Sequence, residues 1–235
     1  MIPLRDLNPT RTTPVVNYLI IALNVLAFLW ELSLGPNIDR ALFNVAFIPA
    51  RFWIPGYLVP NLVTIFVSMF LHGGFMHIAS NMLYLWIFGD NIEDRLGHVR
   101  YAIFYLVCGF GATLSHAFFN ASSRVPSIGA SGAIAGVLGA YLILYPRAQV
   151  TTLIPIFIVM TVRNIPAVFL LGFWFVLQIF SGVGSLGMTG QEQSGGVAYF
   201  AHIGGFVLGM ILINVFGGRR TPPGPRRVET FYREF

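Results

Sequence analysis

Six long apolar runs are the feature that most limits what this chain can fold into. The runs cover approximately residues 15–34, 74–92, 100–119, 131–145, 165–181 and 197–217. A helix of about 20 apolar residues crosses the hydrocarbon core of a bilayer, and it satisfies its own backbone polar groups there. We therefore expect an all-α membrane protein with six transmembrane helices.

The composition supports this class. Of the 235 residues, 56% are hydrophobic and 10% are charged, which is more apolar surface than a soluble domain of this size can bury. The single cysteine, Cys108, has no partner for an intrachain disulfide. We expect no cofactor and no metal. The net charge of +5 comes from arginines between and beyond the apolar runs, so the expected partner is the lipid bilayer and not nucleic acid.

The arginines also predict the orientation. If the N-terminus is cytoplasmic, eleven arginines lie on the cytoplasmic side, and only Arg40, Arg51 and Arg124 lie on the outer side. We therefore expect a multi-pass protein of the plasma (inner) membrane with both termini in the cytoplasm. Residues 1–14 would be the cytoplasmic N-terminus, residues 15–217 the membrane domain, and residues 218–235 a disordered basic cytoplasmic tail.

Polar side chains at one membrane depth predict a functional site. The run that starts at Ser131 has fifteen residues and spans roughly 22 Å, so Ser131 lies roughly 8 Å below the outer surface. His202 is expected roughly 8 Å down its own run, with His77 at roughly 5 Å and Asn81 at roughly 10 Å. Four polar groups from three helices thus share a level that water reaches from the outer face.

Small residues indicate which helices approach closely. One helix face carries three glycines, and a face of the last run carries His202 with two more; the residues expected to pack these helices are Gly132, Gly136, Gly139, Gly205 and Gly209. A close crossing would bring the Ser131 hydroxyl within hydrogen-bond reach of the His202 ring. That geometry suits a nucleophile activated by a base.

Other interpretations of these residues stay open at this point. The Gly-x-Ser-Gly sequence is also typical of a packing motif, and an intramembrane histidine often makes an interhelical hydrogen bond. A metal site built from His72, His77 and His202 would leave Ser131 and Asn81 without a role. A transporter would be indicated by an internal repeat or a charged midplane pathway, and the sequence contains neither.

Three motifs in this order resemble those of the rhomboid family of intramembrane serine proteases. They are "HGGFMHIASNMLYLWIFGDNIEDRLG" (72–97), "GASGAIAGVLGAY" (129–141) and "AHIGGFVLG" (201–209), and the resemblance extends over residues 15–217. It implies a rhomboid-like bundle of the minimal six-helix form that cleaves transmembrane segments of other membrane proteins near the outer face. It also implies that Ser131 is the nucleophile, that His202 is its base, and that His77 and Asn81 stabilise the oxyanion with His72 in support.

The chain departs from the family pattern in two places. Ala135 stands where many members carry an aromatic residue that packs on the catalytic histidine, and "ARFW" (50–53) replaces a Trp-Arg pair. We expect no acidic residue at the depth of the site, hence a serine-histidine dyad whose oxyanion donors include the Ser131 backbone N–H. The alternative is a catalytically inactive rhomboid-like protein that binds membrane-protein clients, although Ser131 and His202 are both present.

Overall fold

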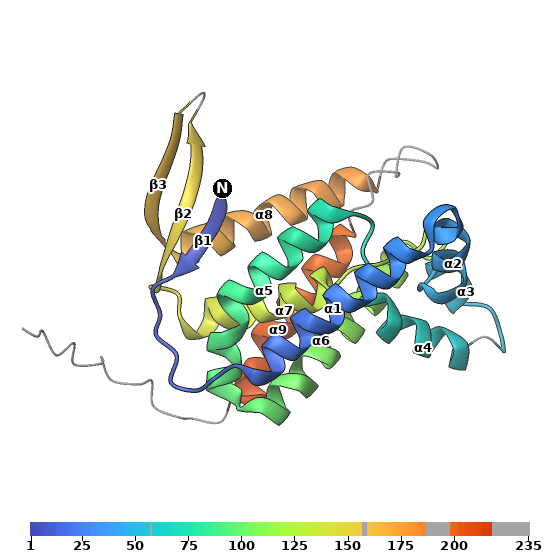
Figure 1. Cartoon of the computed structure of the whole chain (residues 1–235), viewed down its shortest axis with the longest axis horizontal. Coiled ribbons are helices and arrows are strands. Elements are labelled where there is room, and N and C mark those ends of the chain that lie inside the picture. The colour runs from blue at the N-terminus through green and yellow to red at the C-terminus, as the bar shows by residue number, and fades with distance from the viewer. Residues whose placement is uncertain (57, 157–158, 187–197, 218–235) are drawn as a thin grey trace, which may run out of the picture.

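The computed structural model describes residues 1–56, 58–156, 159–186 and 198–217. Helices dominate these residues and form a bundle with roughly aligned axes (Figure 1). Its main members are α1 (Val15–Ser33), α5 (Phe75–Leu96), α6 (His98–Phe119), α7 (Ser131–Leu144), α8 (Ala167–Ser185) and α9 (Tyr199–Phe216). The expected basic tail, residues 218–235, lies outside the described residues.

Helix α7 is the centre of the bundle. Its residues from Gly132 to Tyr141 are all buried, and its glycines let it lie close to both α6 and α9. A Cβ atom on Gly205 would lie 2.1 Å from the Gly132 carbonyl oxygen, and one on Gly209 would lie 2.0 Å from the Gly136 oxygen. A Cβ on Gly139 would likewise lie 2.1 Å from the oxygen of Phe206. The two helices therefore touch backbone to backbone, which only glycine permits.

Among the described residues, four helices are long and apolar enough to cross a membrane, namely α1, α6, α8 and α9. Helix α7 is apolar but has only 14 residues. Helix α5 has 22 residues, and its last turns carry Asp90, Glu93, Asp94 and Arg95. The fold is thus that of a mostly helical membrane protein, and the expected count of six transmembrane helices stays a prediction.

Short helices lie between α1 and α5 at one end of the bundle, which we call the loop end (residues 35–74). They are the 3₁₀ helix η1 (Gly35–Asn37), α2 (Ile38–Val45), α3 (Pro49–Phe52) and α4 (Leu58–Ser68). Phe47 fixes this segment to the bundle because its ring is buried and its backbone N–H donates to Ser68 Oγ at 2.6 Å. It also pairs with Ser127, just before α7. The loop end thus holds the chain that leads into α7.

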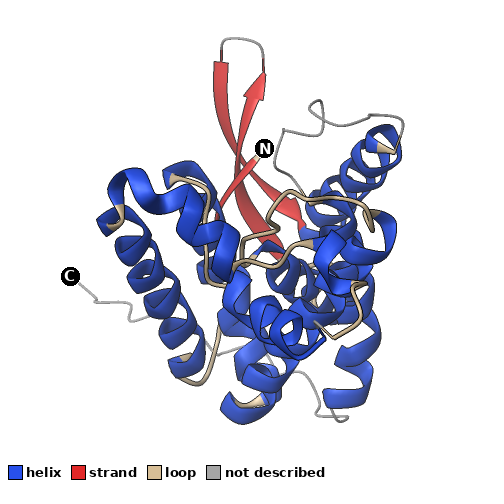
Figure 2. Cartoon of the chain, turned by 90° about the vertical axis from the view of Figure 1, so that its right-hand side faces the viewer, coloured by secondary structure: helices blue, strands red, loops and turns tan. Residues whose placement is uncertain are grey.

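The fold is not all-α, because an antiparallel three-stranded sheet projects from the helices (Figure 2), at the end of the bundle opposite the short helices (Figure 1). The strands are β1 (Ile2–Asp6), β2 (Gln149–Ile156) and β3 (Val159–Pro166), in the order β1-β2-β3. Strands β2 and β3 are rich in β-branched residues, which favour strands. Each strand has eight residues, and the pair lies mainly between the apolar runs 131–145 and 165–181, where the sequence predicts no transmembrane helix. We call this end of the bundle the sheet end (β1 to β3 with the adjoining ends of α1, α5 and α7).

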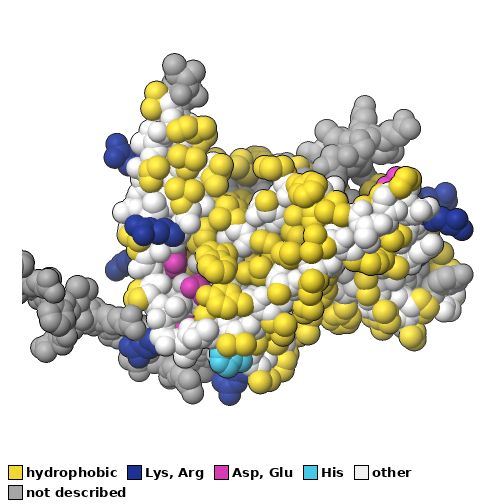
Figure 3. All heavy atoms as spheres, viewed as in Figure 1, with side chains coloured by type: hydrophobic (Ala, Val, Ile, Leu, Met, Phe, Trp, Pro, Cys, Tyr) yellow, Lys and Arg dark blue, Asp and Glu magenta, His cyan; other side chains and the backbone are white. Residues whose placement is uncertain are grey.

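Figure 3 shows how the surface agrees with a membrane environment. Apolar side chains cover the flank of the helices, while arginines gather towards the two ends. The exposed apolar residues include Leu26 of α1, Phe169 and Phe180 of α8 and Val215 of α9. Such continuous apolar surface faces lipid in a membrane protein and would make a soluble protein aggregate.

Candidate active site

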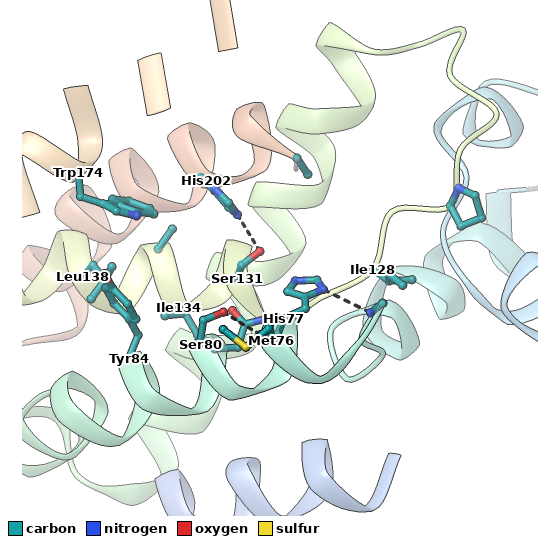
Figure 4. Close-up of a pocket in the computed structure, with 15 residues that line it drawn as sticks. Met76, His77, Ser80, Tyr84, Ile128, Ser131, Ile134, Leu138, Trp174 and His202 are labelled. Carbon is teal, nitrogen blue, oxygen red and sulfur yellow. Dashed lines mark hydrogen bonds between the residues drawn. The ribbon is translucent and has the colours of Figure 1, made fainter. Parts of the chain in front are cut away.

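Ser131 and His202 are brought together by the close contact of α7 with α9. The Ser131 Oγ atom lies 2.8 Å from His202 Nε2, within hydrogen-bond distance (Figure 4). Ser131 is the first residue of α7, and His202 lies in the first turns of α9 and is only 9% exposed. A serine hydroxyl that donates to a histidine nitrogen is the arrangement that activates an oxygen nucleophile.

The segment before Ser131 is held in an unusual conformation. Gly129 has a φ of +127°, and a Cβ atom there would lie 2.8 Å from His77 Nε2, so no other residue fits without a shift. Its N–H donates to the carbonyl oxygen of Ser68 at 2.9 Å. Ser131 therefore starts α7 at a fixed point, where the first N–H groups of a helix are free to bind negative charge.

The pair lies at the wall of a cavity of about 700 Å³. The wall is mostly apolar and is formed by α5, α7, α8, α9 and the segment before α7; polar members of its lining include His77, Ser80, Asn81, Ser131 and His202. Sequence reasoning named all of these except Ser80. The Ser80 hydroxyl donates to the His77 carbonyl oxygen at 2.9 Å. Ser80 thus has a local partner on its own helix.

Asn81 and His77 of α5 offer two hydrogen-bond donors to this cavity. The Asn81 side chain is only 6% exposed, and within the described part of the chain its Nδ2 group has no hydrogen-bond partner. The Gly73 N–H donates to His77 Nδ1 at 3.3 Å, so the ring proton of His77 lies on Nε2. That nitrogen is directed towards Gly129, next to Ser131. A buried donor without an acceptor is costly in a fold, so the Asn81 amide is a candidate donor to a ligand or a reacting group.

His72 lies behind His77 and does not line the cavity. Its ring packs edge-on against the His77 ring, with 5.1 Å between centroids. Burial, together with the neighbouring His77, lowers the pKa of His72 to about 4, so the ring is neutral at pH 7. The ring of His72 thus contacts His77, and its supporting role in the reaction stays a prediction.

Glu31 contradicts the expectation that no acidic residue lies near the site. It is in the last turn of α1 and is fully buried, and its carboxylate accepts a hydrogen bond from the His72 backbone N–H at 2.9 Å. The sequence analysis missed it because it ends an apolar run and its partner is 41 residues away. Glu31 holds the turn before α5. Through His72 it is linked to the His77 ring and not to the His202 ring.

Helix α8 contributes two residues that the sequence analysis did not select. Gln178 Oε1 lies 2.8 Å from His202 Nδ1, and the Trp174 ring lies 5.7 Å from the His202 ring with an interplanar angle of 34°. Trp174 thus packs on the imidazole, where Ala135 offers no aromatic ring. A glutamine inside an apolar run, four residues after a tryptophan, was the signal that could have found them.

The metal alternative finds no geometric support in the described ranges. No group of three or more His, Cys, Asp or Glu side chains there could hold a metal ion. His202 uses its two ring nitrogens for Ser131 and Gln178. His77 and His72 contact each other through their rings.

The chain is similar to several known proteins and to one family model. The family model of the rhomboid domain matches residues 60–219. Rhomboid protein 1, mitochondrial, of Saccharomyces cerevisiae is 28% identical over 83% of this chain and 51% of its own length. RHOMBOID-like protein 4 of Arabidopsis thaliana is 35% identical over 60% of this chain and 31% of its own length. Rhomboid protease GluP of Bacillus subtilis is 35% identical over 55% of this chain and 24% of its own length. The chain therefore spans about half or less of the length of these relatives.

Proposed function

The chain belongs to the rhomboid family, and on that premise we propose that it is an intramembrane serine endopeptidase. Its substrates would be transmembrane segments of other membrane proteins, cut near the outer face. The observation that carries the proposal is the 2.8 Å contact between Ser131 Oγ and His202 Nε2 at the wall of a cavity. One relative, from Bacillus subtilis, is named as a protease, which agrees with this activity.

The first half of the reaction forms an acyl-enzyme. His202 Nε2 takes the hydroxyl proton of Ser131 as Oγ attacks the carbonyl carbon of the scissile bond. The oxyanion of the tetrahedral intermediate would accept hydrogen bonds from the Ser131 backbone N–H, Asn81 Nδ2 and His77 Nε2. When the C–N bond breaks, His202 returns its proton to the leaving amine.

The second half of the reaction needs water at the acyl-enzyme. His202 takes a proton from that water, the resulting hydroxide attacks the ester carbon, and the bond to Ser131 Oγ breaks as the proton returns to the serine. Both catalytic side chains lie near the loop end of the bundle, so water would reach them without crossing the whole membrane. This requirement supports an active site that opens to the outer face.

We also propose the membrane in which the chain lies, which membership of the family does not specify. The arginine distribution supports an N-terminus on the cytoplasmic side of the membrane. Relatives include proteins named as mitochondrial, from yeast and from Arabidopsis thaliana. We propose the plasma membrane with both termini in the cytoplasm, and the bilayer and transmembrane proteins as partners.

A fluorophosphonate probe tests the catalytic assignment. Purified protein in detergent should be labelled covalently, and Ser131→Ala and His202→Ala should abolish both labelling and cleavage of a transmembrane-helix substrate. The matched control is Ser80→Ala, because Ser80 lines the same cavity but its hydroxyl is bonded to the His77 carbonyl oxygen. Labelling that persists in Ser131→Ala would contradict the proposal, and a folded wild type that binds substrate without labelling would favour the inactive client-binding alternative.

A further inference from the structure

We propose that Gln178 is a positioning residue that fixes the tautomer and the orientation of His202. This inference rests on the proposed function, because it assigns a role in preparing the base of that same reaction. The His202 ring has two hydrogen-bond partners. Its Nε2 atom lies 2.8 Å from Ser131 Oγ, and its Nδ1 atom lies 2.8 Å from Gln178 Oε1. The histidine of α9 is thus held from two sides, by α7 and by α8.

The identity of the acceptor decides where the ring proton resides. A neutral imidazole has one N–H, and an amide oxygen can only accept a hydrogen bond. With Gln178 Oε1 facing Nδ1, the proton lies on Nδ1, and the lone pair of Nε2 is directed to the serine hydroxyl. The opposite tautomer would place an N–H against Ser131 Oγ and would leave the hydroxyl without a base. Gln178 therefore selects the productive form of His202.

An amide is better suited to this position than a carboxylate. His202 is buried, and a charged partner at membrane depth would have to be stripped of water. A neutral oxygen orients the ring without that penalty. It also stabilises the protonated ring less, since hydrogen bonds to charged groups are roughly twice as strong as neutral ones. The ring therefore releases its proton readily in each half of the reaction.

The surroundings of Gln178 on α8 agree with a specific role. Trp174 lies one turn earlier on the same helix face and packs on the same ring. The neighbours on the other faces of α8, including Phe173, Leu177 and Phe180, are apolar and exposed to the membrane. A glutamine among such residues is costly unless its amide is used. In α8 the Gln178 amide oxygen lies within hydrogen-bond distance of His202 Nδ1.

The variant Gln178→Leu tests the inference because leucine keeps the bulk and removes the acceptor. We expect kcat to fall by about 10²-fold with little change in KM, as is typical when a catalytic base loses its correct form. Thermal stability should stay near that of the wild type. The matched control is Leu177→Ala, which removes a neighbouring side chain that faces away from the ring and should leave kcat unchanged.

Two further measurements separate positioning from packing. In ¹⁵N NMR of histidine-labelled protein, with His202 assigned by its absence in His202→Ala, the wild type should carry its proton on Nδ1, and Gln178→Leu should populate the Nε2–H form. Gln178→Glu keeps an acceptor, so it should restore part of the rate lost in Gln178→Leu. Its carboxylate would favour the protonated ring, which should move the acid limb of the pH–kcat profile to higher pH.

Each outcome has a definite meaning. A Gln178→Leu variant with wild-type kcat and an unchanged tautomer would overturn the inference, as would a loss of stability with normal turnover per folded molecule. The NMR experiment does not depend on activity. An inactive wild type with the Nδ1–H tautomer would therefore count against the proposed function, whereas an active wild type whose tautomer is indifferent to Gln178 would count against this inference alone.

Discussion

The two ends of the helix bundle both hold buried polar side chains, but they use them differently. At the sheet end, buried carboxylates and amides bond to other parts of the protein. At the loop end, the cavity contains the amide of Asn81, whose Nδ2 has no acceptor within the described ranges. The contrast separates polar groups that are bonded within the fold from the Asn81 amide, for which we propose a role in the reaction.

At the sheet end, the buried side chains of Glu93 and Asn17 have hydrogen-bond partners within the protein. Glu93 is fully buried, and its two carboxylate oxygens accept the backbone N–H groups of Val16 at 2.9 Å and Asn17 at 2.7 Å, in the first turn of α1. The Asn17 amide donates to the Leu85 carbonyl oxygen at 3.0 Å and accepts from the Tyr101 hydroxyl at 2.7 Å. One carboxylate thus caps a helix, and one amide joins α1 to α5 and α6.

Asp6 joins the sheet to the bundle in the same way. Its Oδ2 atom accepts hydrogen bonds from Asn91 Nδ2 at 2.8 Å and from the Tyr141 hydroxyl at 2.7 Å. These partners lie on α5 and α7, so β1 is fixed to both helices by one side chain. Burial raises the pKa of Asp6 to about 6 despite the hydrogen bonds, with a further increase from the nearby Asp90.

The largest difference between the ends should appear in Asn81→Ala. If Asn81 donates to the oxyanion, kcat should fall by about 10² to 10³-fold with little change in KM, because the bond strengthens in the transition state. Stability should change little, since within the described residues the Nδ2 group has no partner to lose. Turnover per folded molecule and the thermal unfolding temperature are the two measurements. A stability loss with normal kcat would contradict the oxyanion assignment.

The matched variant at the other end is Asn17→Ala. It removes the same side chain from a similarly buried position, 0% exposed against 6% for Asn81. Here two hydrogen bonds are lost, so the free energy of unfolding should fall by about 2 kcal/mol while turnover per folded molecule stays normal. If both asparagine variants behaved alike, the distinction between the two ends would fail.

Glu93→Ala should lower the stability of the protein without changing its turnover. It leaves two N–H groups of α1 without their acceptors, and each unsatisfied buried group costs about 1–3 kcal/mol. We expect a clear loss of thermal stability, measured by unfolding in detergent, with normal turnover of the remaining folded protein. Asp39→Ala is the control, because Asp39 is an exposed acidic residue of α2 and its removal should have little effect.

The smallest effect concerns the pH dependence at Asp6. An acid whose pKa is raised in the folded state binds its proton more tightly there, so its contribution favours folding at low pH and is lost as pH rises from about 4 to about 6. Asp6→Asn should remove this component. The measurement is the difference in unfolding temperature between wild type and variant at pH 4 and pH 7. A difference that is constant with pH would mean that Asp6 does not titrate in this range.

An accessibility experiment asks which end faces the cytoplasm. Arg124 and Arg147 are both exposed, near the loop end and the sheet end respectively. On a background with Cys108→Ala, Arg124→Cys should react with an impermeant thiol reagent from outside intact cells, and Arg147→Cys should react only after the membrane is opened. The opposite pattern would place the cavity beside Ser131 and His202 on the cytoplasmic side.

The sequence by itself determined the membrane class, the principal helices and the identity of the catalytic candidates. Apolar runs and glycine spacing depend on local periodicity, so the close contact of α7 with α9 could be predicted from Gly132, Gly136, Gly205 and Gly209. Ser131 and His202 could be selected because polar residues are rare in such runs. These inferences need only the order of residues along one helix and the thickness of a bilayer.

Only the tertiary structure decided the partners of those residues. The sheet forms because β1 pairs with a strand that follows it by more than 140 residues. Glu31 contacts the turn at His72 across 41 residues of the chain, and Gln178 of α8 contacts His202 of α9 across 24 residues. A hydrogen bond depends on distance and direction in space, and helix periodicity does not specify which neighbouring helix presents its partner.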